Sequence, residues 1–250
     1  MLWPLIGLVL TLIPMLYLNR WISRHIQGLG LLVTGSSNVA IMLYFLIMLP
    51  GILIHELSHW LAAKLLGLKT GKISLWPKKS KGNKVRLGSV GVSRADPLRE
   101  SLVGLAPMIV GAGIILLVGA LIFNLSAMRQ AFIVGDLGWF LRLVGQSVWA
   151  SDFWLWLYLI FALSNAMLPS ESDRRAWLPL GIFLAVIGLL LVVVGWTPTI
   201  SATLADSVIG AATYLDSAFV ITLAIDLFFM ALIAGLEWGL SFLLGKRINY

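Results

Sequence analysis

The sequence predicts an all-α polytopic membrane protein with about six transmembrane helices and a small cytoplasmic β-hairpin after the second. Of its 250 residues, 60% are hydrophobic and only 12% are charged, whereas charged residues supply about a quarter of a typical soluble domain. The apolar residues form several runs that are long enough to cross a bilayer. The chain has no cysteine, so any metal ion must be held by histidine and carboxylate side chains.

Six apolar segments are the candidate spans. The first lacks a basic leading region and a cleavage site, so we expect a retained helix, with His25 in a solvated loop after it. The tryptophan-rich stretch 126–151 is expected at the outer membrane interface. Stretch 197–216 has no lysine or arginine, which predicts an outer loop. The predicted spans are Leu2–Leu18, Val39–Leu66, Leu102–Phe123, Phe153–Leu168, Trp177–Trp196 and Phe219–Leu244.

The strongly polar stretch 67–100 follows the second span. Polar and apolar residues alternate over 72–76 and again over 84–92, on either side of a polar Lys-Lys-Ser-Lys-Gly-Asn turn. This pattern predicts a β-hairpin. Its lysine and arginine residues predict that the hairpin and both chain ends are cytoplasmic, at a plasma membrane, and that the hairpin contacts anionic lipid headgroups. Because the loop is tied to the membrane at both ends, no nucleic-acid partner is expected.

The second span carries a His-Glu-x-x-His pattern formed by His55, Glu56 and His59. Residues four apart lie on the same face of a helix, so both imidazoles can bind one metal ion, while Glu56 can contact a metal-bound water. Zinc lowers the pKa of such a water to about 7, and a carboxylate can then take its proton. The alternative is a pair of core histidines. The pattern uses two of the three histidines in the chain, and a charge at membrane depth is costly, which favours a metal site.

A catalytic zinc site needs a third protein ligand and one open position. The second and fourth spans both run inward in the expected topology, which places Asp173 on the same side as His55 and His59. Asp226 and Glu237, in the sixth span, are alternatives, because acids inside a membrane are usually functional. Either could be the third ligand or belong to a proton or ion path, and Asp226 could instead pair with a polar group on a neighbouring helix.

These features resemble the site-2 protease family of intramembrane zinc metalloproteases. The likeness covers roughly the second to fourth spans: the motif helix 55–63, a β-rich loop such as 72–77, and a later helix with Asn165 eight residues before Asp173. The sequence departs from the family pattern at two positions, since Pro169 lies one place later than expected and Arg174 stands where the family has glycine.

The resemblance implies a zinc cofactor and a role for each matched residue. His55, His59 and Asp173 would be the metal ligands, and Glu56 would be the general base. Asn165 would stabilise the substrate or the reaction intermediate, and an interhelical hydrogen bond is the alternative for this residue.

The expected function is therefore hydrolysis of a peptide bond in or near a transmembrane segment of a membrane-protein substrate. The alternatives are an ion-coupled or proton-coupled transporter that uses Asp226 and Glu237, a membrane-protein binder that does not cleave, and an enzyme that acts on a lipid. The whole chain, 1–250, is expected to form a single membrane domain. Its parts would be an N-terminal helix and loop (1–38), a metalloprotease core that includes the basic hairpin (39–175), and two C-terminal helices (176–250).

Overall fold

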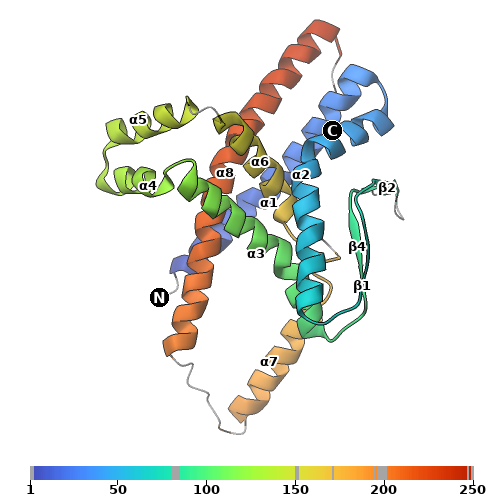
Figure 1. The fold of residues 1–250 in the computed structure, drawn as a ribbon, viewed down its shortest axis with the longest axis vertical. Coiled ribbons are helices and arrows are strands. Elements are labelled where there is room, and N and C mark those ends of the chain that lie inside the picture. The colour runs from blue at the N-terminus through green and yellow to red at the C-terminus, as the bar shows by residue number, and fades with distance from the viewer. Residues whose placement is uncertain are drawn as a thin grey trace.

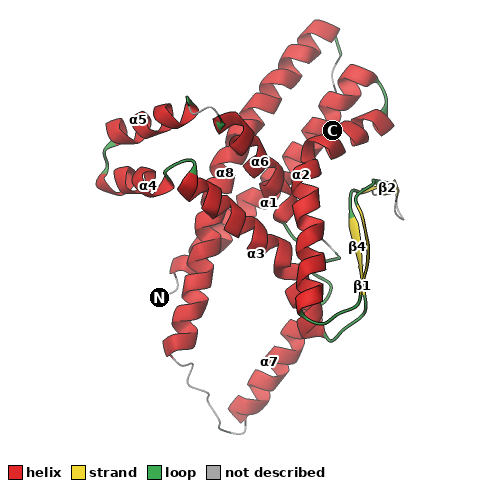
Figure 2. Cartoon of the chain, in the orientation of Figure 1, coloured by secondary structure: helices red, strands yellow, loops and turns green. Residues whose placement is uncertain are grey.

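The computed structural model describes residues 3–79, 85–149, 152–170, 172–193, 195, 202–246 and 248. These residues are mostly helical, with a thin β-hairpin after the second helix (Figures 1 and 2). In chain order the elements are α1 (Trp3–Thr34), α2 (Ser37–Leu65), β1 (Thr70–Ser74), β2 (Lys78–Lys79), β3 (Val85–Arg86), β4 (Ser89–Val92), α3 (Pro97–Leu121), α4 (Leu125–Val134), α5 (Leu137–Val148), α6 (Phe153–Met167), α7 (Trp177–Val193) and α8 (Ala202–Leu244).

Four helices of the described chain are long and apolar enough to cross a membrane, namely α1, α2, α3 and α8. The bent pair α5 and α6 would add a fifth if it is a single broken span. The predicted class, a helical protein with several long apolar helices, is confirmed, whereas the count of six spans is not. By themselves α6, with 15 residues, and α7, with 17, are shorter than the roughly 20 residues that span a bilayer.

Helices α1 and α8 lie side by side and run in the same direction (Figure 1). Near the start of the pair, the Thr11 hydroxyl donates to the Asp216 carboxylate at 3.0 Å, and further along both helices His25 Nδ1 lies 2.5 Å from Glu237 Oε2. Successive spans alternate in direction, so the first and last of six would be antiparallel. The parallel pair instead fits an odd number of crossings.

Two segments that were predicted as loops are helical. The part of 197–216 that the structure describes, residues 202–216, forms the beginning of α8, since it is rich in alanine and leucine and contains no proline. His25 lies inside α1, because Arg20 and Arg24 interrupt the apolar run without breaking the helix. Its ring stacks on Trp21 with centroids 3.8 Å apart. The expectation of a solvated loop at His25 was therefore wrong.

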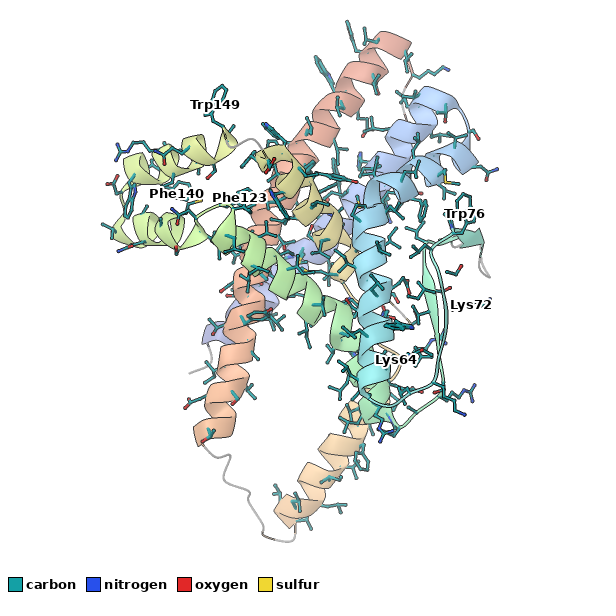
Figure 3. The ribbon with its side chains drawn as sticks, viewed as in Figure 1. Lys64, Lys72, Trp76, Phe123, Phe140 and Trp149 are labelled. Carbon is teal, nitrogen blue, oxygen red and sulfur yellow. The ribbon has the colours of Figure 1, made fainter. Side chains whose placement is uncertain are left out.

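Stretch 126–151 forms α4 and α5 over the residues described. These two helices stand away from the bundle, with Phe140 and Trp149 on them (Figure 3). The Trp149 side chain is 89% exposed, which suits a lipid or interfacial environment. Their position at the outer interface remains a prediction.

Small residues let the helices around the predicted metal site approach closely. A Cβ atom on Gly51 would lie 2.0 Å from the carbonyl oxygen of Ala162, so the backbones of α2 and α6 are in contact one turn before His55. A Cβ on Gly111 of α3 would similarly lie 2.7 Å from the Met167 side chain, at the end of α6. Helices α2, α3 and α6 therefore meet tightly beside the motif.

The predicted hairpin is confirmed in its strand pairing. Strands β1 and β4 are antiparallel, with Ile73 opposite Val90, and β2 and β3 continue the ribbon. Of the predicted turn, 78–83, Lys78 and Lys79 instead form β2, and 80–83 lie outside the described residues. The hairpin runs along α2 (Figure 1), and Trp76 packs on Phe45 of that helix with ring centroids 6.2 Å apart (Figure 3). The ribbon is thus held against the helix that carries the motif.

Candidate metal centre

His55 and His59 lie on successive turns of the second half of α2. Their Nε2 atoms are 3.1 Å apart, and their rings meet edge to face. The two side chains are only 13% and 10% exposed. The four-residue spacing therefore places both imidazoles at one point, as helix geometry requires.

Asp173 reaches the same point from a different segment, just after α6. Its Oδ1 lies 3.3 Å from His59 Nε2, and its Oδ2 lies 3.7 Å from His55 Nε2. The backbone N–H of Ser170 donates to Oδ2 at 2.7 Å and holds the carboxylate in this orientation. The ligand atoms of the three residues all lie within 4.8 Å of one another.

The distances between the two imidazole nitrogens and the carboxylate are close to those of a tetrahedral zinc site. Zinc binds nitrogen and oxygen at about 2.0–2.2 Å, so two ligand atoms of a tetrahedral site lie about 3.4 Å apart. The two imidazole Nε2 atoms are 3.1 Å apart, and the Asp173 carboxylate approaches them with different oxygens, Oδ1 at 3.3 Å from His59 and Oδ2 at 3.7 Å from His55. Two imidazoles and one carboxylate also form a donor set that zinc accepts with a fourth position left open. The residues present therefore fit a zinc ion.

A hydrogen bond to α3 fixes the orientation of His59. Its Nδ1 lies 2.9 Å from the backbone carbonyl oxygen of Val103, and only a protonated Nδ1 can donate to this acceptor. In the neutral ring, which is the form that binds a metal ion, Nε2 is then unprotonated and faces His55 and Asp173. Histidine ligands of metals usually donate their second nitrogen in this way, which sets the tautomer and holds the ring.

The environment of Asp173 favours its charged form. Burial alone would raise the pKa of this carboxyl, but without a bound ion the protonated imidazoles of His55 and His59, and the hydrogen bond from Ser170, hold the pKa well below its usual range. The side chain is therefore a carboxylate, which is the form that binds a metal ion.

Glu56 is buried between α2 and the hairpin. Its side chain is 7% exposed, and a Cβ atom on Gly88 would lie 2.6 Å from its Oε1. The backbone just before β4 therefore lies directly on the Glu56 carboxyl group. Glu56 is adjacent in sequence to His55, so this carboxyl group flanks the metal-binding residues rather than joining them.

Gly104 of α3 makes room for the segment that carries Asp173. A Cβ on Gly104 would lie 2.2 Å from the backbone oxygen of Asp173. We expect Gly104→Ala to lower zinc affinity by about 10-fold or more, because the third ligand must move away from the imidazoles. Metal content of the purified variant under competing chelator measures this. Gly235→Ala is the matched control, because a Cβ on this α8 glycine meets nothing within 4 Å. Equal zinc retention in Gly104→Ala and Gly235→Ala would contradict the expectation.

Asn165 takes part in hydrogen bonds inside the bundle. Its Nδ2 donates to the backbone oxygen of Phe161 at 2.9 Å and to Asp226 Oδ1 at 3.1 Å. Both amide hydrogens are thus engaged, and neither bond reaches the metal-binding residues. The structure shows the interhelical hydrogen bond that was the alternative to a substrate contact.

The structure does not bring Asp226 or Glu237 into the metal centre. Asp226 accepts a hydrogen bond from Ser164 Oγ at 2.9 Å in addition to the bond from Asn165. Glu237 pairs with His25. The predicted pairing of Asp226 with a polar group on a neighbouring helix is confirmed. Within the described part of the chain, the group that can hold a metal is His55, His59 and Asp173.

Three residues at this site are not among the predicted ones. Val103 acts through a backbone carbonyl, which every residue type carries. Gly88 and Gly104 act by the absence of a side chain, and the chain has 24 glycines. Only the position of Gly88 within a predicted strand was informative, because glycine in a strand often marks the close approach of another group.

Comparison of the chain with protein-family models, with curated proteins and with solved structures finds no match.

Proposed function

We propose that the protein is a zinc endopeptidase that hydrolyses a peptide bond in or next to a transmembrane segment of another membrane protein. The observation that carries this proposal is the convergence of His55 and His59 with Asp173, from two separate segments, within a bundle of apolar helices. The resemblance to site-2 proteases in motif and spacing supports the same proposal.

Each residue at the site has a chemical task in this proposal. His55, His59 and Asp173 hold the ion, and the Val103 carbonyl keeps the His59 ring in place. When bound, zinc would supply a water molecule that loses its proton near neutral pH. The Glu56 carboxylate would accept a proton from water and later give it to the departing amine, as a general base and then a general acid.

The hairpin offers a surface for an extended substrate. An intact helix hides its carbonyl groups in hydrogen bonds, so the substrate must unwind at the bond that is cut. An extended segment can add to the edge of a β-ribbon through backbone hydrogen bonds. The β1 and β4 ribbon runs along α2, and its Gly88 backbone adjoins Glu56, which supports a docking place next to the general base.

The basic residues around the hairpin are proposed to lie among cytoplasmic headgroups. Lys64, at the end of α2, and Lys72, on β1, lie on this side of the molecule (Figure 3). Lys64 Nζ stands 5.1 Å from the ring centroid of Trp60, an aromatic and basic pair of the kind that anchors a helix at a membrane interface. Anionic lipids are the partners that this chemistry favours.

Chelation tests the proposal. We expect the purified protein to contain about one zinc ion per chain, as a single three-ligand site requires. It should cleave transmembrane peptides in lipid nanodiscs, lose this activity with 1,10-phenanthroline, and regain it with added Zn²⁺. Cleavage that survives complete removal of the metal would contradict the proposal. So would a zinc-loaded protein that cleaves no member of a broad panel of membrane peptides.

The transporter alternative has weaker support. Asp226 and Glu237 are engaged separately, with Asn165 and His25 respectively, and share no partner among the hydrogen bonds of the described residues.

A further inference from the structure

A cluster of polar side chains lies where α1, α6 and α8 meet, in surroundings that are otherwise apolar. It consists of Asn19, Ser164, Asn165 and Asp226. Three of these residues are nearly inaccessible, with exposed fractions of 0% for Ser164, 9% for Asn165 and 1% for Asp226. Polar groups at such depth are costly unless they are hydrogen-bonded, so their partners define what the cluster does.

The hydrogen bonds of the cluster join three helices. Ser164 Oγ and Asn165 Nδ2 both donate to Asp226 Oδ1, at 2.9 and 3.1 Å, which ties α6 to α8. Asn19 Nδ2 donates to the backbone oxygen of Asn165 at 2.7 Å and to its Oδ1 at 3.3 Å, which ties α6 to α1. Asn165 is thus held through its side chain and its backbone, from both sides.

The bonds act on the last turn of α6. The final four carbonyl groups of a helix have no partner within the helix, and the Asn165 carbonyl is one of these because α6 ends at Met167. Asn19 supplies the missing donor. Beyond Met167, whose side chain is fully buried, the chain leaves the helix with Leu168 extended and reaches Asp173 within a few residues.

We propose that Asn19, Asn165 and Asp226 form a clamp that fixes the end of α6 and so positions Asp173 against the two imidazoles. The metal-binding consequence rests on the proposed function. Asp226 is a positioning residue here, since it contacts Ser164 and Asn165 and is not part of the ligand group. Asn19 and Asp226 lie on α1 and α8, outside the part of the chain that resembles the proteases, so these helices support the metal centre.

Two substitutions at Asp226 distinguish the effect of losing the clamp from a general loss of stability of the helix bundle. Asp226→Leu removes the acceptor of both hydrogen bonds and places an apolar group of similar size in the bundle, while Ser164 Oγ and Asn165 Nδ2 keep the Phe161 backbone oxygen as an acceptor. Asp226→Asn keeps an acceptor oxygen for Ser164 and Asn165. Asp216→Leu is the matched control, because Asp216 lies on the same helix and accepts its hydrogen bond from Thr11 of α1.

Hydrogen exchange of the metal-free protein and zinc release from the loaded protein test the clamp. We expect Asp226→Leu to accelerate both amide exchange in 164–177 and zinc release to a chelator by about 10-fold. This is the lower end of the loss in metal affinity that follows removal of a contact supporting a metal ligand. In Asp226→Asn, the rates of amide exchange and of zinc release should stay within about twofold of wild type. In Asp216→Leu, the two rates should be unchanged.

Any other result would refute one defined part of the proposal. Unchanged exchange in 164–177 of Asp226→Leu, or equal acceleration in Asp216→Leu, would refute the clamp whether or not zinc binds. Faster exchange with unchanged zinc release would refute the positioning of Asp173. A wild-type protein that binds no zinc would instead refute the proposed function, and the exchange data would still decide whether the clamp exists.

Discussion

Glu56→Gln should lower the rate of peptide-bond cleavage by about a thousandfold, within the range that general acid-base catalysis contributes, and leave zinc content unchanged. Glutamine preserves the size of the buried side chain beside Gly88 but cannot accept a proton from water. Glu56 flanks the three ligands without joining them, so its loss should not release the ion. Initial cleavage rates of a transmembrane peptide and metal analysis of the same sample measure both effects.

The control for this variant is Asp206→Asn, which neutralises an exposed acid on α8 far along the chain from the motif. It should cleave at the wild-type rate. Persistent cleavage by pure, metal-loaded Glu56→Gln would exclude Glu56 as the general base. Ion flux in liposomes that survives Glu56→Gln, in a protein without cleavage activity, would favour the transporter.

Asp173→Ala should weaken zinc binding by more than about 100-fold. Loss of an outer supporting contact costs roughly 10–100-fold in metal affinity, and loss of a direct ligand should exceed this. The variant also frees His55 and His59 from the carboxylate that lies 3.3–3.7 Å from their Nε2 atoms. Competition with a chelator of known zinc affinity measures the change.

Glu237→Ala is the comparison that identifies the third ligand. Glu237 is an acid in an apolar helix that pairs with His25 instead of the metal-binding residues, so its removal should leave zinc affinity within about twofold of wild type. If Asp173→Ala retained tight zinc and Glu237→Ala lost it, the assignment of the ligands would have to be reversed.

The local parts of this site were the predictable ones. The shared face of His55 and His59 follows from helix geometry alone, and the strand pairing follows from short-range alternation. The approach of Asp173 could be predicted only from the expected direction of two spans, which places them parallel. Helices α2 and α6 are parallel in the structure, since Tyr158 donates to the Ile47 carbonyl at 2.8 Å and, one turn further along both helices, Gly51 lies against Ala162.

Helix ends and helix directions were harder to predict, for a physical reason. Charged or polar residues predict the end of a span, but a helix ends where its backbone hydrogen bonds stop, and neither Arg20 nor Asp216 stops them. The parallel arrangement of α1 and α8 depends on contacts such as Thr11 with Asp216, between residues at opposite ends of the chain. Sequence patterns of single segments carry no information about such pairs.

The candidate metal-binding residues are divided between an early and a late part of the chain, and this governs when they can come together. During synthesis the two histidines of α2 are inserted long before Asp173 is made. A chain that is still being translated, or that is cut short before α6 docks, therefore has an incomplete coordination sphere. In the proposed function, a chain in which α6 has not docked on α2 would therefore lack the third zinc ligand and would not cleave.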